Sequence, residues 1–333
     1  MKTMKLIPRD APHIRHSDSN KTMMGDMILT LLPFYLIGVC FYGLRVVLLM
    51  LLSAAVCWLA DLVCCLVRGR RFNVRDLSSL VTGLLIPLLM PATISYGVVV
   101  LACIFAIVVV KHPFGGIGEN LFNPAAGGVA FAIACWPEKM FAYPNIFATI
   151  PLGGVSGVAT VSSTAYTLKM GGVPGADLGD VLLGLTPGPV GAASILVVLA
   201  CLLYLAYRRT VPLIQPVCFL AAAALMAFLF PRADIGRTYS VAYELMSGSL
   251  VFGGVFLLSD PVTSPKRFGA RALYGLTAGV LVMVFRRFGG FEQGVTFAVL
   301  LMNAVSEEYD RLVQYLAARA ERERRAPHET CEE

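Results

Sequence analysis

The chain has 333 residues, of which 57% are hydrophobic and 14% charged, and its formal net charge is +6. Together with a mean hydropathy of +0.74, this composition excludes an ordinary soluble globular protein, which could not bury so much apolar surface. It predicts an all-α polytopic membrane protein that resides in a lipid bilayer. The basic residues form no separate patch, so we expect no binding of nucleic acid.

Apolar runs of membrane length, or slightly shorter, follow a polar and basic N-terminal segment. We expect no cleavable signal peptide, because the first apolar run belongs to a segment that stays in the protein. Ten transmembrane segments are predicted, at residues 27–43, 44–67, 78–92, 95–110, 123–136, 190–207, 211–230, 243–259, 272–285 and 292–305. Several are short or interrupted, as at Pro87 and Pro91, and such helices persist only where protein or a cavity surrounds them.

The distribution of Lys and Arg predicts how these segments are oriented. Of the 27 basic residues, 20 lie in segments on the same side as the N-terminus, and such an excess marks the cytoplasmic side. The tails 1–26 and 306–333 are therefore expected in the cytoplasm, the second beginning with a charged amphipathic helix over 306–325. The membrane domain 27–305 is then divided into a first half, an outward-facing loop and a second half, at 27–136, 137–189 and 190–305.

The two halves carry similar motifs in the same order. The pattern SLVxG at 79–83, followed by PxT at 91–93, recurs at 249–253 and 261–263, and FGG at 114–116, followed by Asn123, recurs at 288–290, followed by Asn303. Since the matching segments would run in opposite directions, we expect two inverted five-helix repeats with short broken helices. Such an architecture places a polar site near the midplane of the membrane. Chance similarity between Gly- and Leu-rich segments is the alternative.

Polar side chains at membrane depth are costly and usually face a cavity. The candidates for contact with a second flavin or an ion pathway are Arg75, Asn123, Asp260 and Asn303. An amide can bind a heterocycle without bringing a charge into the bilayer, which favours Asn123 and Asn303, taken as matching positions of the two halves. For His112 and Glu119, a place in a cavity and a plain role in helix capping or headgroup contact are equally compatible with the sequence. Asp61 has no evident partner.

Neither a metal site nor a catalytic residue is expected. The nine cysteines include no Cys-x-x-Cys pair, and most lie in apolar runs, where Cys usually behaves as a small buried hydrophobe. A strand-flanked Gly-x-Gly-x-x-Gly and a Gly-x-x-x-x-Gly-Lys-Ser/Thr loop are both lacking. No general base or nucleophile is visible either, so we expect no nucleotide site in this chain.

Four separated motifs carry a resemblance that reaches from about residue 17 to about residue 311. They are RDLSSLVTGLL at 75–85, FGGIGENLFNPA at 114–125, SDPVTSP at 259–265 and the stretch from FGG at 288 to LLMNA at 300–304. The chain resembles the D subunits of Rnf electron-transport complexes and their relatives, the B subunits of sodium-pumping NADH:quinone reductases. The resemblance implies a subunit of a redox pump of the inner membrane that exchanges electrons between ferredoxin and NAD while moving Na⁺ or H⁺.

The resemblance also implies cofactors and partners. FMN would be esterified through its phosphate to a threonine of the outward-facing loop, and a second, non-covalent flavin such as riboflavin would lie among the helices. Neighbouring membrane and peripheral subunits would carry the iron–sulfur clusters, a further FMN and the NADH site. This subunit would relay electrons and couple that relay to ion movement.

In such subunits the attachment motif ends in Ala-Thr, normally with Asp six residues before the threonine. Ala159-Thr160 supplies this pair, so Thr160 is the first choice for FMN attachment. Position 154 is Gly instead of Asp, and the downstream lysine comes late, at Lys169; that spacing suits Thr164, the alternative attachment residue. The departure at Gly154 also leaves open a loop without covalent flavin, in which case 154–164 is a flexible turn.

Two other classes of protein remain open. Inverted repeats with broken helices also occur in channels and secondary transporters, and without the four motifs a permease for a small solute would rank first. The Ser- and Thr-rich outward-facing loop and the lack of a charged translocation pair argue against it. A scaffold subunit without a cofactor is the third class, because of Gly154.

Overall fold

Apolar helices account for most of the chain, in a computed structural model that describes residues 20–69, 76–115, 118–154, 157–192 and 194–329, with side chains up to Ala320. The first group of helices is α1 (Asn20–Tyr42), α2 (Arg45–Val67), α3 (Ser78–Leu88), α4 (Tyr96–Ile104), the π-helix η1 (Phe105–Lys111) and α5 (Pro124–Cys135). The second group is α9 (Ile195–Tyr207), α10 (Ile214–Leu229), α11 (Arg237–Met246), α12 (Leu250–Phe256), α13 (Phe268–Phe288) and α14 (Val295–Ala304).

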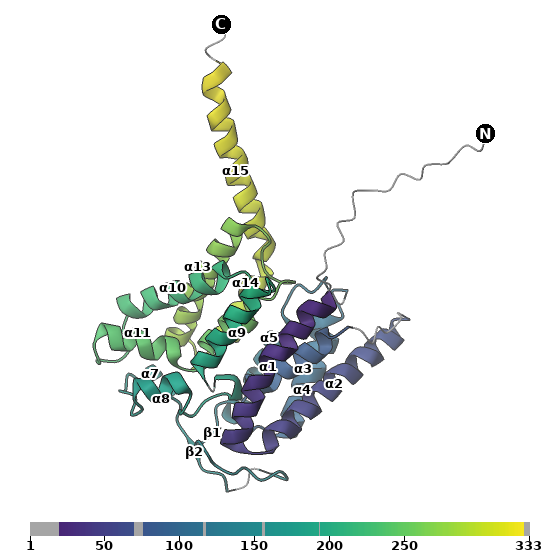
Figure 1. Cartoon of the computed structure of the whole chain (residues 1–333), viewed down its shortest axis with the longest axis vertical. Coiled ribbons are helices and arrows are strands. Elements are labelled where there is room, and N and C mark those ends of the chain that lie inside the picture. The colour runs from purple at the N-terminus through teal and green to yellow at the C-terminus, as the bar shows by residue number, and fades with distance from the viewer. Residues whose placement is uncertain (1–19, 70–75, 116–117, 155–156, 193, 330–333) are drawn as a thin grey trace, which may run out of the picture.

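Short elements connect the two groups, and one long helix follows them. The connection holds α6 (Pro137–Met140), β1 (Tyr143–Pro144), β2 (Thr160–Val161), α7 (Thr164–Lys169), α8 (Leu178–Leu183) and the 3-10 helix η2 (Val190–Ala192). The C-terminal helix is α15 (Ser306–Glu329), so the amphipathic helix predicted over 306–325 is confirmed and extends further. In Figure 1 it projects beyond the bundle.

The prediction of a helical polytopic membrane protein agrees with these elements. Within the described residues, three helices are long and apolar enough to cross a membrane: α1, α2 and α13, of 23, 23 and 21 residues. Helices of this length measure about 30 Å or slightly more at 1.5 Å per residue, the thickness of a bilayer core. Six further apolar helical segments are shorter, at 10–17 residues, so the crossing of all ten predicted segments stays a prediction.

The eighth predicted segment, 243–259, is not one continuous helix. It includes the end of α11 and all of α12, which are separated at residues 247–249. The α11 helix is amphipathic and largely polar, and it packs against α10 and α8. Only the apolar α12, all of whose side chains are buried, lies in the core.

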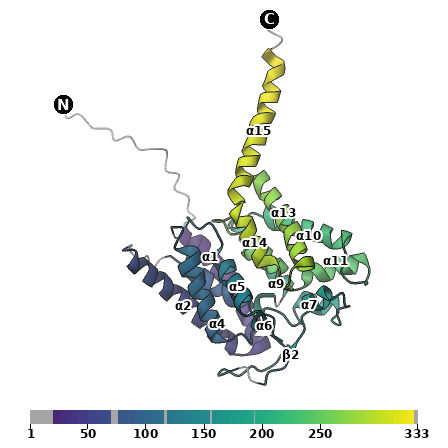
Figure 2. The ribbon, with the colours of Figure 1, turned by 180° about the vertical axis from the view of Figure 1, so that it is seen from behind.

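The two groups of helices lie side by side, the first coloured purple to blue and the second green in Figure 1. Contacts between α1 and α9 and between α5 and α14 join them. Figure 2 shows the same arrangement from behind. In both views the start of α1 and α15 lie at one end of the bundle, and β2 lies at the other.

The short helices α3 and α12 run in opposite directions through the core. The end of α3 and the start of α12 meet at Gly191. A Cβ built on Gly191 would lie 2.8 Å from the carbonyl oxygen of Leu88 in α3 and 3.0 Å from the ring of Phe252 in α12. At the other end, Ser78 at the start of α3 and Asp260 beyond α12 line one cavity. Both helices are buried almost throughout.

The repeated SLVxG motif has the same packing role in both places. A Cβ on Gly83 would lie 2.8 Å from the backbone oxygen of Ser53 in α2. A Cβ on Gly253 would collide with the side chain of Val295 in α14. Each glycine therefore permits a neighbouring helix to approach a short core helix closely, the usual reason for small residues at membrane helix contacts.

Candidate functional site

The loop 137–189 is anchored to the bundle by a buried arginine. Arg45, at the start of α2, is 1% exposed. Its guanidinium donates to the carbonyl oxygens of Ala92, Ile94 and Pro151 at 2.9–3.0 Å and lies 4.5 Å from the ring centroid of Tyr96. Since the first two carbonyls follow α3 and the third belongs to the loop, one side chain joins the loop to a broken helix.

A buried polar network forms a second anchor. The hydroxyl of Tyr143 donates to Glu292 at 2.8 Å and accepts from the amide of Gln293 at 2.7 Å. Ser163 donates to the other oxygen of Glu292 at 2.8 Å, and Ser249 donates to Gln293 at 2.7 Å. Burial, followed by the charge of Glu292, raises the pKa of Tyr143 well above its ordinary value, so its hydroxyl remains a donor. The network joins β1 and α7 to the second group of helices.

These anchors hold the two candidate threonines in different settings. In the antiparallel pair of β1 and β2, Val161 faces Tyr143 and Thr160 faces Pro144. Thr160 is exposed, on extended backbone next to Val161, the residue that faces the anchored Tyr143. Thr164 is 8% exposed at the start of α7, directly after the Ser163 cap. The loop is therefore positioned by buried side chains, and Thr160 is exposed on it whereas Thr164 is buried.

A buried arginine also explains the break between α11 and α12. Arg286 is 0% exposed and donates to the carbonyl oxygens of Glu244 and Ser247, at 2.7 and 2.8 Å. These carbonyls end α11, where no helical partner remains for them. The carboxylate of Glu244 pairs with Arg286 at 3.3 Å and with Arg232. The sequence offered no sign of this cluster, because Arg286 lies about forty residues after Glu244 and Ser247.

An apolar recess lies beside the buried network. Its volume is about 410 Å³. The side chains and backbone of Phe285, Gly289, Phe291, Gln293, Gly294, Phe297, Leu300 and Leu301 line it. Phe291 stacks between Phe141 and Phe297, with ring centroids 5.7 and 6.0 Å apart. Because Gln293 belongs both to the recess and to the network around Tyr143, the recess is close to the loop anchor.

The second candidate site is a small cavity toward the opposite end of the bundle, with a mostly apolar lining and a few polar groups. Its volume is about 60 Å³, and it is lined by Met23, Met24, Met27, Ser78, Val81, Thr82, Leu85, Lys111, Gly118, Asn120, Asn123, Pro124, Thr210, Phe256, Asp260, Pro261 and Val262. The N-termini of α3 and α5 and the C-terminal end of α12 meet there. Their backbone dipoles bring both positive and negative partial charges to one place.

Asn123 and Asp260 form the polar centre of this cavity. The side-chain oxygen of Asn123 caps α5 by accepting from the backbone of Ala126 at 3.1 Å. Its amide donates to Asp260 at 3.2 Å and to the carbonyl oxygen of Leu257 at 3.4 Å. Asp260 also accepts from the backbone of Val262 at 3.1 Å. Among the described residues, Asp260 forms no ion pair, although it is partly buried.

Lys111, the last residue of η1, brings a positive charge to the same cavity. Its ammonium lies 3.2 Å from Asp61 and 3.7 Å from Asp76, and it donates to the hydroxyl of Ser78 at 2.8 Å. His112 also contacts Asp61, at 2.7 Å. The partners that Asp61 lacked in the sequence are therefore supplied by η1 and the residue after it, about fifty residues away. His112 is buried in this cluster, whereas Glu119 is exposed.

The two predicted asparagines do not occupy matching positions. Asn123 precedes α5 as its cap, whereas Asn303 lies at the end of α14 and accepts a hydrogen bond from Tyr274 at 3.1 Å. The prediction that they correspond is therefore wrong, because their distances from the preceding FGG motifs differ. Gly294 takes the cap position of α14. Arg75 lies outside the described residues.

Comparison with known proteins agrees with the resemblance carried by the four motifs. Residues 7–317 match the NQR2, RnfD, RnfE family. The D subunit of a proton-translocating ferredoxin:NAD(+) oxidoreductase complex of Clostridium ljungdahlii is 28% identical over 91% of this chain and 93% of that protein. The D subunit of a Na(+)-translocating ferredoxin:NAD(+) oxidoreductase complex of Acetobacterium woodii is 29% identical over 94% of this chain and 95% of that protein. The D subunit of an ion-translocating oxidoreductase complex of Ectopseudomonas mendocina is 30% identical over 91% of this chain and 93% of that protein. The chain therefore belongs to the NQR2, RnfD, RnfE family.

Proposed function

We propose that this membrane protein is the D subunit of an ion-translocating ferredoxin:NAD oxidoreductase and that it carries FMN as a phosphoester on Thr160. Full-length similarity to proteins named as such subunits supports the assignment to a complex. The exposed hydroxyl of Thr160, on a loop fixed by Arg45 and Tyr143, is the observation that carries the cofactor proposal. The other subunits would hold the iron–sulfur clusters, a further FMN and the NADH site.

Access favours Thr160 over Thr164 as the attachment residue. A modifying enzyme must reach the hydroxyl before a phosphoester can form, and Thr160 is exposed in β2. Thr164 is buried against the bundle, where esterification would require the first turn of α7 to move. The glycine at 154 presents no steric obstacle, since an added Cβ there meets nothing within 4 Å.

The apolar recess offers a place for the ring system of a flavin attached at Thr160. It has the size and the aromatic lining that are usual for small-molecule pockets. Phe291 and Phe297 provide faces for stacking, and the side chain of Gln293 provides an amide. When bound, a flavin supplies one- and two-electron transfer, while the protein sets its distance to other centres and excludes water.

The cavity at Asn123 and Asp260 does not fit the second flavin in this conformation. A volume of about 60 Å³ accommodates water or a small cation but not a three-ring system, since a single water occupies about 30 Å³ in the liquid. We propose instead that Asp260 lies on the ion pathway. Relatives of nearly equal similarity are named as proton-translocating and as Na⁺-translocating, and Asp260 suits either ion. Neither Asn303 nor Arg75 is assigned a role in this pathway.

The proposed topology has ten crossings in two inverted repeats within a membrane domain at 27–305. The opposite directions of α3 and α12 and the matching glycine contacts of Gly83 and Gly253 support the repeats. The excess of basic residues supports a cytoplasmic location, in a bacterial inner membrane, for both tails. The loop 137–189 would then face outward, in agreement with the position of β2 at the far end of the bundle (Figure 1).

A channel or secondary transporter is the competing function. The inverted helices and the partly buried Asp260 suit either class, so the presence of a cofactor decides between them. The test is production of the full chain together with a flavin transferase, followed by denaturing electrophoresis and mass spectrometry of the tryptic peptide 140–169. We expect fluorescence of the denatured chain and a peptide heavier by FMN less one water. An unmodified peptide in a transferase-competent cell would overturn the flavoprotein proposal and favour a transporter or a scaffold.

A further inference from the structure

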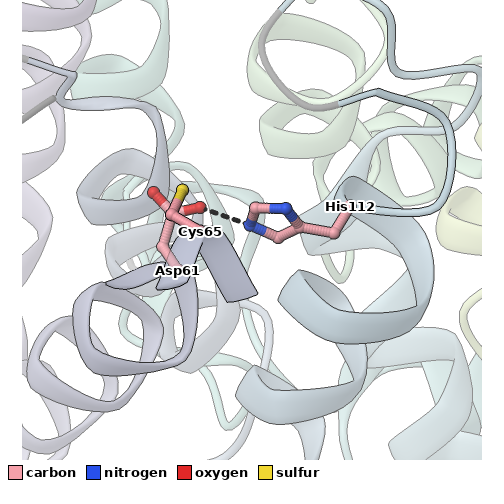
Figure 3. Close-up of side chains that lie close together, drawn as sticks. All are labelled: Asp61, Cys65 and His112. Atoms are coloured by element: carbon pink, nitrogen blue, oxygen red, sulfur yellow. Dashed lines mark hydrogen bonds and ion pairs between the residues drawn. The ribbon is translucent and has the colours of Figure 1, made fainter. Parts of the chain in front are cut away.

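A cluster of three metal-ligand side chains adjoins the second cavity through Lys111 but does not line it. Asp61 and Cys65 are one helical turn apart on the same face of α2, and His112 follows η1 (Figure 3). The ligand atoms, a carboxylate oxygen, a thiol sulfur and an imidazole nitrogen, all lie within 4.8 Å of one another. Asp61 and His112 are buried, and Cys65 is partly exposed, so the cluster is reachable from its Cys65 side.

The local backbone explains why His112 reaches the cluster. The amide of His112 donates to the carbonyl oxygen of Ile107 at 3.1 Å, five residues back, which is the hydrogen bond of a π-helix. This wider turn brings both Lys111 and His112 to the carboxylate of Asp61. Segments with this geometry are often found at functional sites.

The chemistry of the three side chains selects the class of ion. Thiolate, imidazole and carboxylate together suit Zn²⁺ and similar borderline-soft cations, whereas Na⁺ and Mg²⁺ prefer oxygen ligands alone. Lys111 and His112 both contact the same oxygen of Asp61, Oδ1, and Figure 3 shows the thiol of Cys65 beside the carboxylate. The site is therefore chemically distinct from any pathway for the transported ion.

We propose that Asp61, Cys65 and His112 form a binding site for Zn²⁺ or a similar divalent transition-metal ion, with the fourth coordination position open to water. Ligands of tetrahedral zinc are about 3–4 Å apart, given bonds of about 2.0–2.3 Å, so the distance between His112 and Asp61 lengthens slightly when the metal takes the place of the proton between them. In a neutral ring this proton moves to Nδ1 of His112, and a doubly protonated ring releases it to solvent. The thiol of Cys65 releases its proton to solvent on binding. Lys111 stays next to the site and keeps Asp76 as a partner.

Charges of both signs surround the cluster. Lys111 contacts Asp61, and Arg68 donates to the backbone oxygen of His112, so two positive groups oppose the incoming ion. The carboxylates of Asp61 and Asp76 and the thiolate formed at Cys65 offset them. Occupancy would join α2 to the end of η1 at the edge of the cavity lined by Lys111.

The test uses the purified full chain in detergent, with an affinity tag that contains no histidine, titrated with Co²⁺ and then with Zn²⁺. We expect a thiolate-to-cobalt charge-transfer absorption that Zn²⁺ abolishes by displacement. Cys65→Ser should remove this absorption, and His112→Gln should weaken Co²⁺ binding by more than about tenfold, since even residues behind the ligands contribute about 10–100-fold. Circular dichroism checks that both variants are folded.

Cys64→Ser is the matched control, because Cys64 is the neighbouring thiol in α2 and lies outside the cluster. It should bind Co²⁺ as the parent chain does. The other three histidines, at 13, 16 and 328, lie near the chain ends, and their replacement should leave the absorption unchanged. The proposal is overturned if Cys65→Ser retains the absorption, if Cys64→Ser loses it equally, or if no absorption forms at all.

Discussion

The two ends of the bundle differ in which polar side chains they bury and in what those side chains contact. At the loop end, Arg45 and Tyr143 satisfy carbonyl groups and a carboxylate, and the one hydroxyl of interest, on Thr160, is left outside. At the cavity end, the carboxylate of the partly buried Asp260 accepts, among the described residues, from the amide of Asn123 and the backbone of Val262. This contrast matches the two proposed roles, attachment of a cofactor at the loop end and passage of an ion at the cavity end.

The largest expected effect is the loss of covalent flavin when the threonine at the loop end is replaced. Thr160→Ala should abolish covalent flavin, as judged by fluorescence of the denatured chain. The reason is that β2 offers no other exposed threonine on which a phosphoester could form. Ser162→Ala, an exposed hydroxyl two residues away, should leave the fluorescence unchanged, and Thr164→Ala should retain it. Retention in Thr160→Ala together with loss in Thr164→Ala would reassign the attachment residue.

A change at the cavity end should leave the flavin in place and reduce ion movement. Asp260→Asn keeps an acceptor for Val262 but removes the charge. Contacts to a charged group contribute about 1.5–3 kcal/mol, so redox-driven ion uptake by vesicles containing the whole complex should require about tenfold more ion or worse. Asp234→Asn, at an exposed aspartate, is the control. Normal uptake by Asp260→Asn would remove this residue from the pathway.

The anchoring network should contribute to stability. Tyr143→Phe removes the donor to Glu292 and leaves a buried carboxylate with fewer partners, which costs about 1–3 kcal/mol in the free energy of unfolding. Thermal unfolding in detergent measures the loss. Tyr166→Phe, in the same loop and 41% exposed, should change stability little. Equal stability of Tyr143→Phe and the parent chain would show that the hydroxyl of Tyr143 does not hold the loop in place.

The smallest expected effect concerns the departure at position 154. Gly154→Asp supplies the carboxylate usual in resembling subunits, and the site has room for it. We expect a modest rise in the fraction of chains that carry flavin after a short period of induction. Gly153→Asp introduces the same charge one residue earlier, where a Cβ also meets nothing within 4 Å. If both variants raise the fraction equally, the position of the carboxylate is immaterial.

Local sequence was sufficient for some features of both ends. Apolar runs predicted the helices, because burial of a continuous apolar segment requires little knowledge of its neighbours. Ala159-Thr160 identified the candidate hydroxyl through a short motif. By contrast, Asn303 was paired with Asn123 from the order of motifs alone, and the structure shows different helix positions for them.

The sequence by itself therefore determined that the protein belongs in a lipid bilayer, and it also determined the helices, the family and the candidate attachment loop. Each of these depends on residues close together in the chain. Tertiary structure alone decided which buried polar groups meet. Glu292 contacts Ser163 and Tyr143 across more than a hundred residues, and Asp61 finds Lys111 and His112 on another helix and at its end. Partners of buried polar groups are selected by the packing of helices, and packing is a property of the whole chain.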